Sequence, residues 1–180
     1  MNCGEMDILF KRQTIFRVIM IQITPQKNQI AAALLKAEKL GSLNNSICNG
    51  EGNVYGFLGE IIVSEYIGGQ IKNTYDFDII KNNLKIEVKT KRCTSKPQDH
   101  YNCSVAAYNI KQKCDVYVFV RILEDFSKAW ILGAINKEDF YKYSVFNKGK
   151  TIDNKSSLKW KFKADCYNLP INKLKNIKVK

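Results

Sequence analysis

The sequence has a single histidine, His100, and none of its six cysteines forms a Cys-x-x-Cys pair. A histidine-based nucleophilic triad would have to use His100, in the loop-like segment 94–102, which argues against serine- or cysteine-hydrolase chemistry. Scattered cysteines are typical of reduced thiols inside a cell. A zinc site drawn from Cys93, His100, Cys103 and Cys114 stays open as an alternative, although the spacings match neither a zinc knuckle nor a zinc ribbon.

The chain has no stretch that is apolar for long enough to span a membrane, and Lys11 and Arg12 interrupt the short apolar run near its start. We therefore expect a cytoplasmic protein with no signal peptide and no membrane partner. With 180 residues, the chain has the length of one domain that buries most of its apolar surface. We assign this domain to residues 23–180 and treat residues 1–22 as an N-terminal extension of uncertain structure.

Arginine is scarce as well, since only four of the 29 basic residues are arginine, while the formal net charge is +12 and the pI is near 9.4. Such a positive charge predicts a polyanionic partner, and nucleic acid is the default. Arginine is the preferred bidentate reader of guanine, so its scarcity favours recognition of the backbone or of DNA shape. We expect DNA rather than RNA, although an AT-rich genome would also produce the lysine excess.

Two alternating segments, 73–80 and 84–90, predict a β-hairpin. Asn82 and Asn83 form its turn, because asparagine tolerates the positive φ angles of two-residue hairpin loops. This register places Asp78 opposite Glu87, and it leaves an apolar face made of Tyr75, Phe77, Ile79, Ile86 and Val88.

Two acids facing each other across a hairpin destabilise it, unless a cation lies between them. Mg²⁺ binds one or two carboxylates and completes its octahedral shell with water and phosphate oxygens. Lys89 projects from the same face as Glu87, where an ammonium could orient a water or stabilise charge on a phosphate. The alternative is a solvated face with alternating charges. Asp76 is a reserve ligand, although the register pairs it with Lys89.

A helix expected over residues 54–67 is apolar almost all round, so it should be buried. Glu60 interrupts this surface, and a buried carboxylate needs a partner. If the role of Glu60 is structural, its charge is compensated by a salt bridge or removed by protonation. If its role is functional, Glu60 binds a metal ion that the hairpin acids also bind. Gly56 and Gly59 would let a strand or a phosphate backbone come close.

Asp78 on one strand, Glu87-Val88-Lys89 on the next and Glu60 on the preceding helix together resemble the PD-(D/E)xK phosphodiesterase superfamily, over about residues 53–135. Phe77-Asp78 stands where the family has Pro-Asp. The resemblance implies an α/β, restriction endonuclease-like fold, in which helices flank a central mixed β-sheet with an α-β-β-β-α-β core. It also implies Mg²⁺-dependent hydrolysis of phosphodiester bonds, with Mn²⁺ as a substitute.

The resemblance also implies roles for single residues. Asp78, Glu87, the Val88 carbonyl and Glu60 would ligate the metal, and Glu60 is preferred over Glu65. Lys89 would position or activate the attacking water.

Three further residues would bind nucleic acid: Lys91 and Arg92, which continue the strand, and Gln112 on a short helix expected over 103–113. The rival interpretation is a catalytically silent nucleic-acid-binding module or subunit of the same fold. Symmetric cleavage would require a homodimer, for which the sequence shows no self-complementary surface.

The remaining segments complete the expected fold. A helix should begin at Thr24-Pro25 and end at Gly41. Segment 115–123 is nearly continuously apolar, as in a central strand covered on both faces, and 128–135 should pair with it. Asn136 should cap a helix. Segment 158–166 alternates apolar residues with lysines, which predicts a strand with one basic face that either blocks aggregation or lines a duplex.

Overall fold

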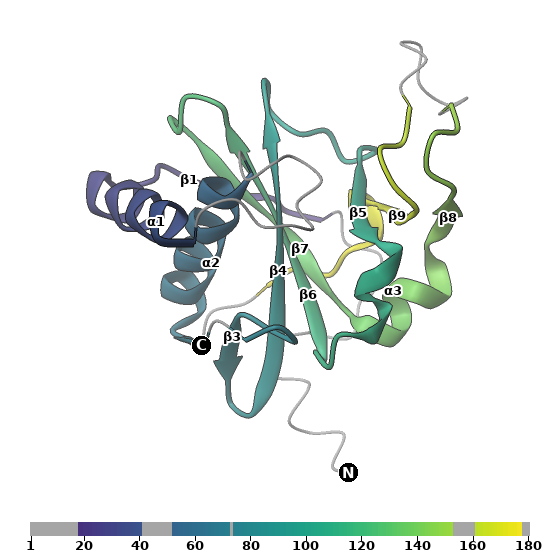
Figure 1. Cartoon of the computed structure of the whole chain (residues 1–180), viewed down its shortest axis with the longest axis horizontal. Coiled ribbons are helices and arrows are strands. Elements are labelled where there is room, and N and C mark those ends of the chain that lie inside the picture. The colour runs from purple at the N-terminus through teal and green to yellow at the C-terminus, as the bar shows by residue number, and fades with distance from the viewer. Residues whose placement is uncertain (1–17, 41–51, 73, 153–160, 178–180) are drawn as a thin grey trace.

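The structure is a computed structural model that describes residues 18–40, 52–72, 74–152 and 161–177. It is an α/β protein built on a mixed six-stranded sheet, with a second sheet of three strands beside it (Figure 1). The larger sheet has the order β1-β7-β6-β4-β3-β2, and within it β4 and β6 run parallel while the other neighbours are antiparallel.

The strands of the larger sheet are β1 (Ile21–Ile23), β2 (Gln70–Ile71), β3 (Ile79–Lys81), β4 (Leu84–Cys93), β6 (Val116–Leu123) and β7 (Ala129–Asn136). The smaller sheet has the order β5-β9-β8 and comprises β5 (Asn102–Ala106), β8 (Val145–Asn147) and β9 (Cys166–Pro170). The α-helices are α1 (Lys27–Leu40), α2 (Asn53–Ile67) and α3 (Lys137–Tyr143). Two short 3-10 helices are η2 (Ala107–Lys111) and η3 (Ile171–Lys173).

Each face of the larger sheet buries its own apolar cluster, because side chains alternate between the two faces along every strand. Helices α1 and α2 cover one face, and β5, β9 and α3 cover the other (Figure 1). The cluster under α2 includes Leu58, Ile62, Val63, Ile79, Ile86, Val88, Val118 and Ile131. The opposite cluster includes Val105, Tyr117, Phe119, Trp130, Leu132, Phe140, Leu169 and Ile171.

Helix α2 is buried as its apolar sequence predicts, and it ends at Gly68, whose φ of 65° is the left-handed conformation of a C-terminal cap. It packs closely on β4 next to Glu60. A Cβ at Gly59 would lie 2.0 Å from Thr90 Oγ1, so only glycine allows this approach. The expectation that glycine lets a strand approach this helix is confirmed for Gly59. It is wrong for Gly56, where a Cβ would meet no atom within 4 Å.

The hairpin turn and the three predicted register pairs nearest to it are confirmed. Asn82 and Asn83 have φ angles of 48° and 63°, and Lys81, Ile80 and Ile79 pair with Leu84, Lys85 and Ile86. The first arm is shorter than expected, so a strand over all of 73–80 is wrong.

A local turn replaces the first half of this arm. Thr74 Oγ1 donates to the Phe77 carbonyl at 2.7 Å and accepts from the Phe77 N–H at 3.0 Å. Residue 73 lies outside the described residues. The expected apolar face is therefore also wrong in part, because Tyr75 is 72% exposed and Phe77 packs against the cluster under β5 and β9.

Two other expected elements differ. The helix expected over 103–113 is wrong, since this segment forms β5 and then the 3-10 helix η2. Of the strand expected over 158–166, residues 158–160 lie outside the described part of the chain. Residues 162–165 are not in a strand, and β9 begins only at Cys166.

The central strands expected over 115–123 and 128–135 are confirmed as β6 and β7, and α3 begins directly after Asn136. Helix α1 begins at Lys27, later than expected from Thr24-Pro25. The expected boundary between residues 22 and 23 falls inside β1, which pairs with β7. Within the described ranges, no helix is long and apolar enough to cross a membrane.

Candidate functional site

Asp78 lies just before β3, where its carboxylate takes the place of a backbone acceptor. Its N–H donates to the Ile86 carbonyl at 3.0 Å, and its own carbonyl accepts from the Lys72 N–H at 2.7 Å. Its side-chain Oδ2 accepts from the Val88 N–H at 2.8 Å. The side chain is therefore fixed against β4 at the centre of the Glu87-Val88-Lys89 motif.

Glu87 and Lys89 project from the face of β4 opposite α2 and form an ion pair, with 2.6 Å between Glu87 Oε1 and Lys89 Nζ. The Glu87 side chain is 8% exposed and that of Lys89 is 19% exposed. Because both groups are largely buried, removing one of them would leave an uncompensated buried charge, which costs more than breaking a surface salt bridge. The pair leaves Glu87 Oε1 engaged.

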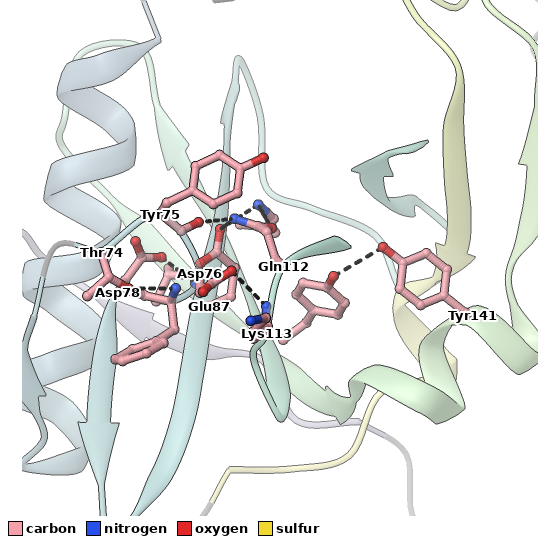
Figure 2. Close-up of polar contacts among 12 residues, drawn as sticks. Thr74, Tyr75, Asp76, Asp78, Glu87, Gln112, Lys113 and Tyr141 are labelled. Carbon is pink, nitrogen blue, oxygen red and sulfur yellow. Dashed lines mark hydrogen bonds and ion pairs between the residues drawn. The ribbon is translucent and has the colours of Figure 1, made fainter. Parts of the chain in front are cut away.

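Gln112 closes the other side of this pair (Figure 2). Its Nε2 donates to Glu87 Oε1 at 3.0 Å and to the Tyr75 carbonyl at 2.9 Å, and its Oε1 accepts from Lys89 Nζ at 3.3 Å. The buried amide thus contacts both charged groups and joins them to the segment before β3.

Burial raises the pKa of Asp78 to about 8, with the negative charges of Glu87 and Glu60 as further causes. The pKa of Glu60 is likewise raised to about 7, mainly by burial, which Lys36 opposes and the charge of Glu87 reinforces. The three carboxylates therefore lie close enough to repel one another, although they come from α2, from the end of the β3 arm and from β4. Asp78, Glu87 and Glu60 form the acidic cluster.

Two oxygens of the acidic cluster fit a bound cation. Glu60 Oε2 and Glu87 Oε2 are buried and have no hydrogen-bond partner. An unpaired buried carboxylate oxygen is costly, and hard cations such as Mg²⁺ prefer oxygen ligands of this kind. These two oxygens are of the type that the predicted Mg²⁺ takes as ligands, and Glu87 Oε2 is available while Oε1 bonds to Lys89.

The acidic cluster is not yet arranged as a closed set of ligands. In the described part of the chain, no three histidine, cysteine or acidic side chains are grouped so that they could hold a metal as they stand. This also applies to the zinc alternative, Cys93, His100, Cys103 and Cys114. Binding of a cation at the acidic cluster would require side-chain movement. Lys89 would have to move away from Glu87, or Glu87 would have to bind Lys89 and the cation at the same time.

The other residues predicted for the site lie along β4, and Arg92 is not brought to the acidic cluster. Val88 places its side chain in the core under α2 and its N–H on Asp78, while ligation by its carbonyl stays a prediction. Lys91 is on the same face of β4 as Lys89. Arg92 pairs with Glu124 at 3.3 Å on the surface.

Asp76 does not belong to the acidic cluster. Its Oδ1 accepts from the Lys113 N–H at 3.0 Å, and it lies before β3, so its predicted pairing with Lys89 across a ladder is wrong. The carboxylate instead joins the loop before β3 to the segment after η2. Asp78 is therefore the acid of this arm that reaches Glu87.

Arg121 is a charged residue that sequence reasoning missed. It is paired in register with Lys91 on the parallel strand β6 and is 9% exposed. Its only signal was a single charge inside the apolar run 116–123. A lone charge in a buried strand needs compensating polar contacts, which marks the position as unusual.

No protein family model matches the chain, and a search of curated proteins found no match.

Proposed function

We propose that this protein is a metal-dependent nuclease of the PD-(D/E)xK type that hydrolyses phosphodiester bonds in DNA. The observation that carries the proposal is the pair of buried carboxylate oxygens without a hydrogen-bond partner, Glu60 Oε2 and Glu87 Oε2, together with the Lys89 ammonium 2.6 Å from Glu87 Oε1. Mutual repulsion among buried acids is relieved by a cation, and a cation held by acids next to a lysine suits metal-assisted hydrolysis.

Each residue has a role in this proposal. Asp78, Glu87 and Glu60 would hold Mg²⁺ or Mn²⁺, together with the Val88 carbonyl. When bound, the metal would supply Lewis-acid stabilisation of the phosphate and lower the pKa of a bound water. Lys89 would hold the attacking water and stabilise negative charge on the phosphate.

Gln112 would keep the Lys89 ammonium in place through its side-chain oxygen. We treat Gln112 as a positioning residue, since its buried amide contacts Lys89 and Glu87 rather than the surface. Lys91 and Arg92 would hold the substrate strand, and the net charge of +12 supports a polyanionic substrate.

The same proposal includes a restriction endonuclease-like fold. A helix, the β3–β4 hairpin and the parallel strand β6 follow the expected order around the acidic cluster. The crossover from β4 to β6 departs from that order, because β5 and η2 occupy the place of the expected helix.

The experiment is a cleavage assay on labelled duplex, four-way, flap and single-stranded DNA and on RNA, with Mg²⁺, Mn²⁺ or EDTA. We expect metal-dependent cleavage of at least one substrate. Lys89→Ala should lower the rate by about 10²- to 10³-fold, as expected for the loss of a group that stabilises transition-state charge, while binding is retained.

Helix α2 offers a matched control. Glu60→Gln should reduce cleavage, whereas Glu65→Gln should not, because the Glu65 carboxylate accepts from Gln29 Nε2 at 2.6 Å outside the acidic cluster. Equal effects of the two substitutions would remove Glu60 from the site. Folded protein that cleaves nothing with either metal would overturn the nuclease proposal.

The Glu87–Lys89 pair favours one second candidate, a catalytically silent nucleic-acid-binding module. The ammonium already neutralises Glu87 at 2.6 Å, so the pair could persist without a metal. This candidate predicts DNA binding that is equally strong in Mg²⁺ and EDTA, with no cleavage in either.

A further inference from the structure

A small cavity lies directly beside Lys89, on the face of β4 turned away from α2. Its volume is about 90 Å³, and it is lined by Lys89, Thr90, Lys91, Asn102, Cys103, Ser104, Phe119, Val120, Arg121 and Leu132. Three of these residues are cationic, and none of the described residues that line it is acidic. Lys89 lines the cavity and pairs with Glu87 of the acidic cluster, so the two are neighbours.

The cationic groups come together because of the sheet itself. Lys91 and Arg121 are register partners on the parallel strands β4 and β6, so their side chains leave the sheet on the same face. Like charges at adjacent positions of a ladder destabilise a sheet. A sheet that served only as a scaffold gains nothing from this pair.

Within the part of the chain that the structure describes, Arg121 contacts two neutral groups. Its Nη2 donates to the Asn102 carbonyl at 3.0 Å, and its guanidinium lies 5.5 Å from the centre of the Tyr101 ring. These contacts fix its direction without cancelling its charge. Burial lowers the pKa of Lys91, and the charge of Arg121 lowers it further, although the Lys91 side chain still reaches solvent.

We propose that this cavity is a phosphate-binding pocket, in which Lys91 and Arg121 hold a phosphate of the nucleic acid next to the one positioned at Lys89. The proposal rests on the nuclease function proposed above. The cavity has room for one tetrahedral oxyanion. An arginine and a lysine together combine a fixed planar donor with a mobile point charge, which suits a phosphate.

Binding of inorganic phosphate tests the pocket without any cleavage. The protein is titrated with phosphate in EDTA and followed by NMR amide shifts, with chloride at matched ionic strength as the reference anion. We expect phosphate to shift the amides of β4 and β6 in the wild type, and Lys91→Gln to weaken its binding at least tenfold. Arg121→Gln should do the same.

Lys85→Gln is the matched control. It removes the same charge from the same face of β4, but Lys85 lies over the Phe77 ring and not at the cavity. Phosphate should bind this variant as it binds the wild type. No saturable phosphate binding by the wild type, or equal binding by Lys91→Gln and the wild type, would overturn the pocket even if the protein cleaves DNA.

A pair of duplexes of one sequence, with a 5′-phosphate or a 5′-hydroxyl, identifies which phosphate enters. If the pocket takes a terminal phosphate, the wild type prefers the phosphorylated duplex in EDTA and Lys91→Gln loses this preference. If it takes an internal phosphate, Lys91→Gln weakens binding of both duplexes equally. If Lys91→Gln loses phosphate binding but the wild type cleaves no substrate, the phosphate pocket is supported and the nuclease function is rejected.

Discussion

Asp78→Asn is the substitution that most directly tests the acidic cluster. Asparagine keeps the size of the side chain and can still accept the Val88 N–H through its oxygen. It removes one of three mutually repelling charges. In the metal-free protein we therefore expect Asp78→Asn to be more stable than the wild type at high pH and equally stable at low pH.

The sign follows from the raised pKa. Burial and the neighbouring acids raise the pKa of Asp78 from 3.8 to about 8. The folded state therefore holds a proton that the unfolded state releases, so the stabilisation is fully present below about pH 4 and is lost as the pH rises to about 8. Glu60, whose pKa rises to about 7, loses stability over the same range.

The size of the effect follows from the same values. At about 1.4 kcal/mol per pKa unit, Asp78 alone lowers the free energy of unfolding by about 4 kcal/mol between about pH 5 and pH 8. At about 2–4 °C per kcal/mol for a chain of this length, the melting temperature should fall by roughly 10 °C. Asp78→Asn should show a much smaller fall.

The measurement is thermal and urea unfolding in EDTA, across about pH 4 to pH 9, for the wild type and Asp78→Asn. Other groups also titrate over this range, so the informative quantity is the difference between the two proteins at each pH. Parallel stability curves would refute the reasoning, because they would mean that Asp78 is ionised normally in the folded protein.

Two further predictions concern the same part of the fold. Adding Mg²⁺ at about pH 8 should stabilise the wild type and raise its melting temperature, and the free energy of unfolding should increase by up to about 3 kcal/mol at a hundredfold excess of Mg²⁺ over Kd. Glu87→Gln should lose most of this gain. An equal gain in both proteins would place the cation elsewhere. Gly59→Ala should lower the free energy of unfolding by about 1–3 kcal/mol in urea, because its Cβ would lie 2.0 Å from Thr90 Oγ1. Helix propensity alone predicts the opposite, and an increase in stability would mean that α2 moves away from β4 freely.

Local chemistry made part of the fold predictable from sequence. The Asn82-Asn83 turn fixes the hairpin register by its own φ preferences, and the apolar run 116–123 leaves little alternative to a strand buried on both faces. The neighbourhood of Asp78 and Glu87 followed from this register. Glu60 could be included in the predicted site because burying a carboxylate on an apolar helix is costly unless it has a partner.

The parts that failed depend on contacts distant in sequence. Segment 102–106 pairs with 166–170, and the local sequence of 103–113 does not indicate this pairing. The alternation of 73–80 predicts a strand, yet Thr74 and Phe77 close a turn that side-chain hydrogen bonds favour. Gln112 was singled out, but its bonds to Glu87 and Lys89 depend on how η2 folds back onto β4.

The bond from the Val88 N–H to the Asp78 carboxylate gives the hairpin an end that responds to charge. A carboxylate accepts a hydrogen bond more strongly than a neutral acid does, so ionising Asp78 tightens the junction between this arm and β4, and adding a proton loosens it. A bound cation would favour the ionised form. Through the Val88 amide, binding of a cation at the acidic cluster would therefore change the rigidity of the sheet backbone at this position.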